Sequence, residues 1–365
     1  MHDHLVQRGG GDRVVISMAR AFPGAPVHTA FFRPDNTYPE LAAFDIRPLP
    51  IGRIPGLRMH HRAALPLLAP AFSRLRLDAD VMVCGSSGWA SGAHTTGRKI
   101  VYFHALARWL HERAAYLATS GPLPRLGLAP LAPWLRRWDK RAVGSADRLL
   151  VYSQAMAGEV ERVYGLRAEV LPPPVTVDPV GPTRPLDVAP GFALCVCRLT
   201  AYKNIDVVIE AFRLRPHDQL VVAGTGPDEA RLRATAPPNV TLLGQVDDLA
   251  MRWLYGNCRL MVSAAFEPFG LVTLEANVFG RPVAVFGKGG FRDTVVEGMT
   301  GRFFGELDAV QVSEAIDQVD GDNVDRAVLQ AHAAKWSEAT FIARLRRIVA
   351  EEAERVRSGD PDRGP

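Results

Sequence analysis

The chain has 365 residues, of which 47% are hydrophobic and 22% are charged. This composition excludes an intrinsically disordered chain, and the length predicts two domains that each bury a core. No run of about 18 apolar residues occurs, so no membrane-spanning helix is predicted. The first residues also lack a secretory signal pattern, and a cytoplasmic location is therefore expected.

Charge is distributed unevenly along the chain. Residues 1–180 hold 22 Lys and Arg against 14 Asp and Glu, whereas residues 181–365 hold 21 against 25. A basic first half predicts that this half meets something anionic. Charge alone leaves a membrane surface, a phosphorylated acceptor and nucleic acid as alternatives.

Short apolar runs alternate with amphipathic stretches along the whole chain, which predicts βαβ units and an α/β fold with parallel sheets. The predicted strands cover residues 27–32, 81–84, 100–103, 148–152, 192–197, 220–223, 240–243, 260–263 and 282–286. The predicted helices cover residues 12–21, 154–164, 204–214, 228–236, 248–255 and 336–352.

A glycine turn precedes the first predicted helix. Residues 9–12 would present backbone amides at a helix N-terminus, which suits phosphate, although a flexible turn explains them equally well. A Rossmann-like domain starts with a strand, and the residues before this turn hold only part of one. Either the natural start lies upstream or the first strand is truncated, and the first explanation is favoured.

Two stretches of the first half combine cations with apolar or aromatic residues. Residues 53–76 hold five Arg, two His and no acidic residue, and Trp109 and residues 134–138 mark a second stretch. Such segments can rest on anionic lipid headgroups, which predicts peripheral association with a membrane. Solvated basic loops explain them nearly as well.

Two further polar features of the first half have competing interpretations. Asp78 and Asp80 match a metal-binding DxD pattern, but they directly precede an apolar strand, so no essential metal is predicted. His104 follows the predicted strand 100–103 at its carboxyl end, where it could reach a ligand. A structural role is the commoner alternative for a single histidine.

A segment rich in Pro and Gly, residues 172–190, separates two α/β halves and is predicted to be a linker. It divides the chain into a first domain of residues 1–175 and a second of residues 190–333. Two doubly wound domains are expected to face each other across a ligand-binding cleft. A C-terminal helix, residues 334–354, and a disordered tail, residues 355–365, follow.

Two cations leave the carboxyl end of the predicted strand 192–197. An Arg fork at 198 and a Lys point charge at 203 suit a diphosphate leaving group whose charge grows during reaction. Solvated loop cations are the alternative, and the position at a strand end favours the functional interpretation. The turn at residues 224–227 lacks a complete GxGxxG pattern, which argues against a dinucleotide dehydrogenase.

The four cysteines lie at positions 84, 195, 197 and 258 and show no zinc-type spacing. Cys195 and Cys197 are expected on one face of a strand. Reduced, buried thiols are predicted.

Glu267 and Glu275 flank a glycine turn that opens a predicted helix. The amides of Gly270 and Leu271 would lie at the helix N-terminus, where an anion is stabilised. The two carboxylates could accept hydrogen bonds from hydroxyl groups. Spacing alone does not distinguish this arrangement from two surface glutamates.

Together these segments resemble family 4 retaining glycosyltransferases of the GT-B fold over nearly the whole chain. The strongest motif, residues 267–275, matches that family's E-x7-E pattern and continues as EANVFGRPVAVFGKGG. CRLTAYKNID looks like the family's diphosphate-binding segment. YFHALARWLHE looks like members that build lipid-linked or surface polysaccharides, often mannosyltransferases.

The resemblance implies roles for residues of the second half. Arg198 and Lys203 would hold the donor diphosphate, and Glu267 would contact the transferred sugar. Glu275 would bind the ribose. The remaining donor-binding residues would line the sugar or lie near the base: Phe269, Gly270 and Leu271 for the sugar, Gln245 and Val246 for the base.

In the first half, the resemblance implies that Gly10 approaches the phosphate and that His104 lies beside the anomeric carbon. The chain is expected to move a sugar, with mannose from GDP-mannose as the best guess, to a glycan or lipid-linked acceptor with retention. No metal, no cofactor besides a GDP- or UDP-sugar donor and no nucleic acid are expected. The expected location is cytoplasmic, including the inner face of the plasma membrane.

Two alternatives remain at this point. A GT-B epimerase or phosphorylase would act on related substrates, and a catalytically silent partner would only bind a sugar nucleotide. The presence of Arg198, Lys203 and Glu267 argues for transfer and against a silent partner.

Overall fold

The structure is a computed structural model that describes residues 1–54, 56–57, 65–111 and 131–358. The chain divides into two compact units, of which unit 1 comprises Met1–Pro174 with Glu338–Pro365 and unit 2 comprises Val175–Ser337. The first division falls inside the segment 172–190. The chain therefore leaves unit 1, forms unit 2 and returns to unit 1 with its last helix.

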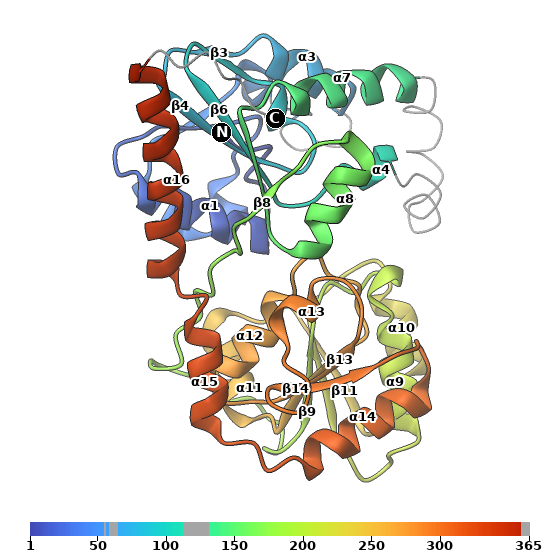
Figure 1. Cartoon of the computed structure of the whole chain (residues 1–365). Helices are drawn as coiled ribbons and strands as arrows, with labels where there is room; N and C mark the ends of the chain where they lie inside the picture. Colours follow the sequence, from blue (N-terminus) through green and yellow to red (C-terminus); the bar gives the residue numbers. More distant parts are fainter. Residues whose placement is uncertain (55, 58–64, 112–130, 359–365) are drawn as a thin grey trace. The chain divides into compact units, whose positions relative to one another are not determined.

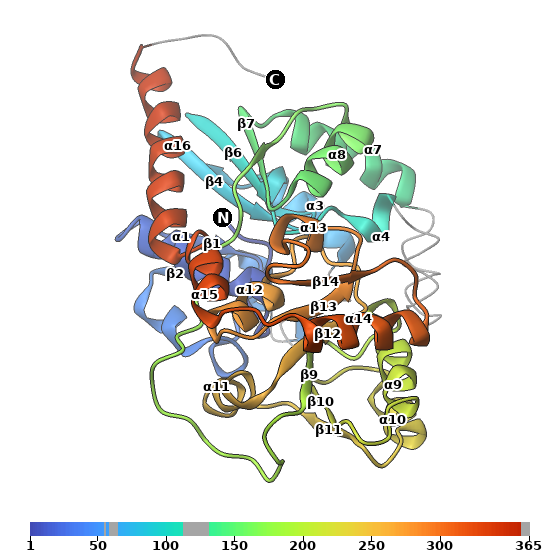
Figure 2. The same cartoon turned by 60° about the horizontal axis from the view of Figure 1, so that its bottom comes forward.

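Unit 2 contains a six-stranded parallel sheet in the order β11-β10-β9-β12-β13-β14 (Figures 1 and 2). The strands are β9 (Ala193–Val196), β10 (Leu220–Ala223), β11 (Val240–Gly244), β12 (Leu260–Ser263), β13 (Val283–Phe286) and β14 (Gly301–Phe304). Strands are added to one side of β9 up to β11 and to the other side from β12 onward. Doubly wound sheets bind ligands at the carboxyl ends of the strands where the order reverses, which here is between β9 and β12.

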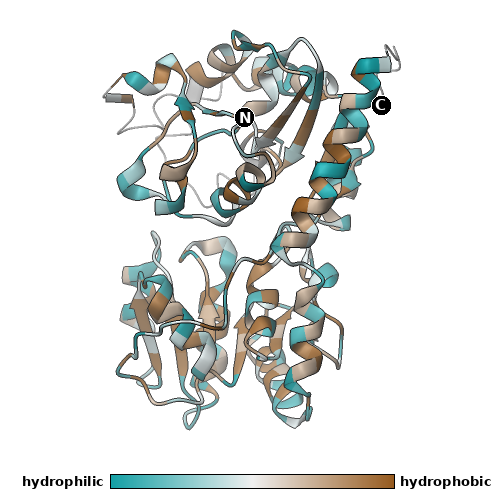
Figure 3. Cartoon of the chain, turned by 90° about the vertical axis from the view of Figure 1, so that its left-hand side faces the viewer, coloured by the Kyte–Doolittle hydropathy of each residue, from teal (hydrophilic) through white to brown (hydrophobic). Residues whose placement is uncertain are grey.

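Helices cover both faces of this sheet. Alternate strand residues point to opposite faces, so Val222 contributes to one core cluster and Val221 to the other. The strands are accordingly coloured hydrophobic in Figure 3. The face with Val222 is covered by α9 (Ile205–Arg213), α10 (Glu229–Thr235) and α14 (Ala309–Gly321). The face with Val221 is covered by α11 (Asp248–Asn257), α12 (Leu271–Val278) and α13 (Phe291–Thr294). Helix α15 (Arg326–Ala334) packs on α12.

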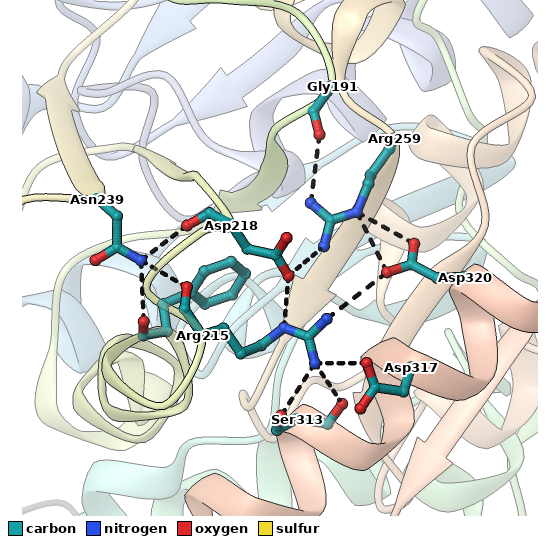
Figure 4. A network of polar contacts seen from close by, with 9 residues as sticks. Gly191, Arg215, Asp218, Asn239, Arg259, Ser313, Asp317 and Asp320 are labelled. Carbon is teal, nitrogen blue, oxygen red and sulfur yellow. Dashed lines mark hydrogen bonds and ion pairs between the residues drawn. The ribbon is translucent and has the colours of Figure 1, made fainter.

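A polar network holds the amino-terminal ends of these strands (Figure 4). Arg215 reaches Asp218 at 2.6 Å and Asp317 of α14 at 2.7 Å. Arg259, directly before β12, reaches the same Asp218 at 3.0 Å and Asp320 of α14 at 3.1 Å. The network therefore ties α14 to the starts of β10 and β12, at the edge opposite the carboxyl ends where ligands bind.

Unit 1 also has a parallel sheet. Its strands are β1 (Val27–Thr29), β2 (Ile46–Pro48), β4 (Val81–Ser86), β6 (Arg98–Phe103), β7 (Arg148–Val151) and β8 (Glu169–Val170), with a separate pair β3 (Arg76–Leu77) and β5 (His94–Thr95). β1 pairs with β2, and the others follow in the order β4-β6-β7-β8. His2 forms bridges with both Thr29 and Gly85, so the first residues lie between β1 and β4.

The α-helices of unit 1 are α1 (Gly10–Ala21), α3 (Leu65–Ser73), α4 (Arg108–His111), α7 (Ala132–Gly144), α8 (Gln154–Tyr164) and α16 (Glu338–Ser358). Short 3-10 segments within the described residues are η1 (Pro34–Asn36), η2 (Pro39–Ala43), η3 (Pro50–Arg53), η5 (Ala90–Gly92) and η6 (Ala201–Lys203).

The C-terminal helix α16 completes unit 1, lying along α1, β4 and β6 (Figure 1). Its buried face carries Phe341, Leu345 and Ile348. Near its end, the fully buried carboxylate of Glu352 accepts a hydrogen bond of 2.5 Å from Arg98 of β6. Apolar burial and an ion pair together fix the helix to the sheet.

The structure confirms the predicted α/β fold with parallel sheets, and it corrects several details. Strand β14 was not predicted, because its sequence GRFF is short and starts with glycine. Helix α16 starts at Glu338 and continues to Ser358, so residues 355–358 are helical and not a disordered tail. Arg355 extends the helix by pairing with Glu352 at 2.9 Å. Residues 359–365 lie outside the described residues.

The Pro- and Gly-rich segment is packed on unit 2 after Val175. Val177, Leu186 and Val188 contact the core cluster on the face of α11 and α12. The amide of Arg184 donates to Leu249 at 3.2 Å. The segment predicted as a linker therefore follows the surface of unit 2 for much of its length.

In the described part of the chain all four cysteines are free thiols. Cys195 of β9 and Cys197, directly after the strand, pack at the same core cluster, as predicted, with their Sγ atoms 3.9 Å apart. Cys197 is only half-buried, in contrast to the prediction of buried thiols. Over the same residues no helix is long and apolar enough to cross a membrane.

Within the described ranges, no group of three or more His, Cys, Asp or Glu side chains could hold a metal ion. The Asp78 carboxylate accepts a hydrogen bond of 2.9 Å from Thr96. The expectation that no metal is needed stays a prediction.

Candidate active site

The loops that follow β9 and β12 are tied to each other. Asn204 ends η6 in the left-handed region, with φ of 52°. Its side-chain amide donates to the carbonyl of Ala264, directly after β12, at 2.9 Å. The residues that follow these two strands therefore meet at the point where the strand order of unit 2 reverses.

An ion pair between Lys203 and Glu267 lies at this point. Lys203 is buried, whereas 17% of the Glu267 side chain is exposed. Burial by itself would lower the pKa of Lys203, but the adjacent Glu267 carboxylate outweighs burial and the pKa lies above its ordinary value. The ammonium is therefore charged at neutral pH, and the pair presents a polar, partly open surface.

Arg198 is the second predicted cation of this loop. Its side chain is exposed, and among the described residues no hydrogen bond or ion pair engages its guanidinium. The next residue, Leu199, is buried, and its amide donates to Thr225 at 3.0 Å. An anchored backbone thus presents a guanidinium that is available to an anion.

The turn after β10 packs against the Arg198 loop. A Cβ at Gly224 would come within 1.9 Å of the Cys197 carbonyl, and one at Gly226 within 2.1 Å of the Leu199 carbonyl. Glycine is needed here for close approach of two backbones. This agrees with a strand-to-helix turn, in which Pro227 lies two residues before α10.

The loop between Glu267 and α12 is rigidly held. Gly270 precedes α12 with φ of 92°, and a Cβ there would come within 2.5 Å of Phe291. Phe269 is buried, and its backbone lies against Gly290, where a Cβ would be 2.3 Å from the Phe269 Cα. The Gly290 amide also donates to Glu267 at 2.8 Å. Helix α12 then starts at Leu271, with its amino end beside Glu267.

The other predicted donor-binding residues of unit 2 lie around this centre. Glu275, in α12, is half-buried and accepts a hydrogen bond of 2.8 Å from Tyr255. Gln245 is exposed and Val246 half-buried, both directly after the edge strand β11. Because β11 lies two strands from β9, these residues are at one end of the row of loops.

In unit 1, His104 directly follows β6 and is buried. Its Nδ1 forms a hydrogen bond with the Tyr152 hydroxyl. Its Nε2 has no hydrogen-bond partner among the described residues and lies against Gly85, where a Cβ would be only 2.4 Å away. Burial, and then the neighbouring His2, hold the pKa of His104 well below its ordinary value.

The glycine turn of unit 1 lies beside this histidine. Gly10 is exposed at the start of the 12-residue helix α1. A Cβ on Gly11 would lie 3.7 Å from the His104 ring. Asp12 is buried in the first turn and lies 3.5 Å from His2. The structure therefore brings the turn and His104 together within this unit.

Sequence reasoning missed several polar residues of these clusters. Tyr152 follows β7 just as His104 follows β6, and that shared strand-end position could have identified it. Tyr255, the partner of Glu275, carries no comparable signal. Lys288, in the loop after β13, and Arg292, in α13, were also missed although a strand end precedes them.

The basic stretches of unit 1 are described in part. Arg58, His60, His61 and Arg62 lie outside the described residues. On α7, Trp134 is 49% exposed, whereas Trp138 donates to Ser73 at 2.8 Å and packs on Trp89.

Two family models match the chain one after the other. The Glycosyltransferase Family 4 model matches residues 8–179, and the glycosyl transferases group 1 model matches residues 184–336. Together the two models span most of the chain and support the predicted family 4 glycosyltransferase, whereas no match supports the mannosyltransferase type.

The chain is similar to curated proteins named D-inositol 3-phosphate glycosyltransferase from Mycobacterium bovis and Mycobacterium tuberculosis. Each is 28% identical over 310 residues, a match that covers 75% of this chain. The match spans 62% of the length of those relatives.

Solved structures resemble the chain over almost its full length. HepE of Anabaena, solved in complex with UDP-glucose, has a TM-score of 0.69 at 17% identity and is matched over 96% of this chain and 98% of its own. Sucrose-phosphate synthase of Thermosynechococcus elongatus has a TM-score of 0.68 at 18% identity with the same coverage. At such identities the likeness shows the fold, and the GT-B prediction is confirmed.

Proposed function

We propose that this glycosyltransferase moves a sugar from a nucleoside-diphosphate donor to an acceptor hydroxyl with retention at the anomeric carbon. The observation that carries the proposal is the cluster at the switch point of unit 2. There Arg198 and the charged Lys203 follow β9, and Glu267, which pairs with Lys203, and the amino end of α12 follow β12. A diphosphate next to a hydroxyl-rich sugar satisfies all three groups.

Catalysis by this cluster is mainly electrostatic. Arg198 and Lys203 stabilise the negative charge that grows on the departing diphosphate, and amides at the start of α12 add to that field. Glu267 accepts hydrogen bonds from the transferred sugar and keeps Lys203 in place. Gly10 and His104 keep the roles that the family resemblance implies, as predictions for unit 1.

The donor base and sugar are the least constrained part of the proposal. The sequence resemblance favours mannose from GDP-mannose, whereas the fold neighbour HepE was solved with UDP-glucose. A thermal-shift screen across GDP-, UDP- and ADP-sugars separates these choices, because a ligand that binds the folded state stabilises it by mass action. We expect GDP-mannose to give the largest rise in melting temperature. If a UDP-sugar gives a larger rise, that UDP-sugar replaces GDP-mannose as the proposed donor.

The transfer itself is tested with a labelled donor. The retaining proposal expects a glycoside with the anomeric configuration of the donor, read by NMR. Inversion would contradict it. An epimerase would return an altered sugar nucleotide, and a phosphorylase would release a sugar phosphate. A silent binding partner would bind the donor without transfer or hydrolysis, and Glu267→Ala would then leave both binding and cell phenotype unchanged.

The acceptor proposal is a glycan or lipid-linked hydroxyl presented at the inner face of the plasma membrane. Support comes from the exposed face of α7, where Trp134 lies among Arg136, Arg137, Lys140 and Arg141. Aromatic and cationic side chains together favour anionic lipid headgroups. Sedimentation with anionic liposomes at low salt tests this part, and absence of the protein from the pellet would remove the membrane from the proposal.

A further inference from the structure

The loop after β13 carries two cations that the proposed transfer does not use. Lys288 follows Phe286 by two residues, and Arg292 lies one turn further along in α13. Both side chains are exposed. Within the described residues, no ion pair with a carboxylate engages either of them.

The position of Lys288 is well defined by its neighbours. Its ammonium lies over the ring of Phe286, 5.1 Å from the ring centroid, and that ring is itself stacked on Phe304 at 5.9 Å. An aromatic face attracts a cation without cancelling its charge. Lys288 therefore remains able to bind an anion while its position is restricted.

The same loop is pressed against the donor loop. A Cβ on Gly289 would come within 2.7 Å of the Glu267 carbonyl, and the Gly290 amide donates to that carbonyl at 2.8 Å. Lys288 therefore directly precedes the two glycines that contact the Glu267 backbone. The Glu267 carboxylate across this contact is already paired with Lys203.

The strand order fixes which part of the substrates Lys288 can meet. Along the carboxyl edge of the sheet, Gln245 follows β11, Arg198 follows β9, Glu267 follows β12 and Lys288 follows β13. If these loops take the base, the diphosphate and the sugar in that order, Lys288 comes after the sugar, one strand spacing of about 4.8 Å further along. It is therefore on the side of the transferred sugar that is remote from the nucleotide.

We propose that Lys288 is a specificity-determining residue that recognises an anionic group, a carboxylate or phosphate, carried by a sugar substrate beyond the diphosphate. The group belongs either to the transferred sugar or to the acceptor, and both sources offer the same chemistry to the ammonium. Arg292, whose guanidinium donates to the Gly287 carbonyl at 2.6 Å, adds positive charge to the same loop. This inference rests on the proposed function.

The donor arm of the test uses pairs that differ only in a C6 carboxylate, UDP-glucose with UDP-glucuronate and GDP-mannose with GDP-mannuronate. Binding is measured by calorimetry and turnover by donor hydrolysis, for the wild type, Lys288→Gln and Lys288→Arg. If the anion is on the donor, the wild type prefers the uronate, and Lys288→Gln loses about ten- to a hundred-fold of that preference. Lys288→Arg keeps the charge and retains part of it.

The acceptor arm uses inositol 3-phosphate and inositol, each added with saturating UDP or GDP. If the anion is on the acceptor, the phosphorylated compound binds more tightly to the wild type, and Lys288→Gln removes the difference while donor binding is unchanged. Salt weakens the preference in either arm, because the charges are near the surface.

Lys335→Gln is the matched control, since Lys335 is an exposed lysine of unit 2 at the end of α15. It should behave as the wild type in both arms. The inference is overturned if Lys288→Gln discriminates the charged from the neutral compound as the wild type does, or if the wild type itself shows no preference in either arm. A wild type that binds and hydrolyses no sugar nucleotide instead contradicts the proposed function.

Discussion

The Lys203–Glu267 pair shows how one residue contact joins two loops of the candidate site. Lys203 follows β9 and Glu267 follows β12, so the pair crosses the switch point of the sheet. The carboxylate keeps the lysine charged despite its burial, as the raised pKa indicates. In the proposed function, the charge on Lys203 is therefore maintained by the same residue that we propose to contact the sugar.

Replacing Lys203 by Met should lower kcat/KM by about a hundred- to a thousand-fold, because a positive charge at the departing diphosphate is lost. Lys203→Arg preserves the charge and should lose less. Steady-state kinetics with the donor found in the thermal-shift screen checks this prediction. A Met variant that is folded and within two-fold of the wild type would show that Lys203 has no part in the transition state.

Gly270 has a positive φ and no space for a side chain, so a larger residue at this position is both strained and crowded. Gly270→Ala should destabilise unit 2 by about 1–3 kcal/mol, since alanine is strained there and also meets Phe291. Gly256→Ala is the control: this helical glycine of α11 has open space around a Cβ and should gain about 0.5–1 kcal/mol. Urea unfolding of both variants checks the contrast, which would fail if they shifted in the same direction.

His104 is expected to stay neutral over the physiological pH range. In the folded state its pKa is well below the ordinary value of about 6.5. Below about pH 6.5 the unfolded chain therefore binds a proton at this histidine that the folded chain does not bind. The native state is therefore fully stabilised above about pH 6.5 and loses stability as the pH falls further.

NMR titration of the imidazole signals measures this directly. The His104 signal should not change as the pH falls through about 6.5, the midpoint of an unperturbed histidine. If the His104 signal titrates with an ordinary midpoint, the prediction that burial lowers the pKa of this histidine is wrong. The same titration reports whether the Tyr152 hydrogen bond persists.

At the scale of elements, the attachment of α16 depends on charge as well as apolar burial. Glu352 is fully buried and pairs with Arg98, whereas Glu351 is a half-exposed partner of Arg148 at 2.6 Å. The two carboxylates are adjacent in sequence but differ in burial. Comparing the two therefore tests how burial changes the contribution of a glutamate–arginine ion pair to stability.

Glu352→Ala should cost about 3–5 kcal/mol, because it leaves Arg98 buried without its closest partner. Glu351→Ala should cost at most about 1 kcal/mol, as expected for an exposed ion pair. Thermal or urea unfolding, with a probe that reports on unit 1, measures both. Equal effects of the two variants would mean that the Glu352 pair contributes nothing beyond a surface contact.

At the scale of the whole molecule, the two units are connected asymmetrically. Unit 2 is a continuous stretch of chain, whereas unit 1 needs α16 from beyond it. Stability should therefore respond differently in the two units when the last helix is removed. This asymmetry follows from chain connectivity and from the buried apolar residues of α16.

A chain that ends at Ser337 should retain a protected unit 2 and lose protection in unit 1, where Leu345 and Ile348 normally cover the sheet. Hydrogen exchange followed by mass spectrometry can resolve the two units in one experiment. Peptides from β10 and β12 should exchange slowly, and peptides from β4 and β6 should exchange faster than in the full chain. Uniform protection throughout would show that unit 1 does not depend on α16.

Much of the fold was predictable because strand-and-helix alternation is a local property. Buried parallel strands such as β10 and β12 appear as short apolar runs, and their predicted bounds agree with the structure. Strand β14 escaped prediction because a short GRFF segment has no such local signal. The end of α16 was also misplaced, since its last turn is stabilised by Arg355 and Glu352 and not by hydrophobic periodicity.

The sequence by itself determined the fold class, the family and the residue types of the candidate site, because motif spacing and strand-end position are visible along the chain. Only the tertiary structure decided that Lys203 is paired with Glu267, that Tyr152 is bonded to His104, and that Gly289, next to Lys288, lies against the Glu267 backbone. These contacts join residues separated by tens of positions, and local patterns carry no information about such partners. They become specific only when the parallel strands place their carboxyl ends side by side.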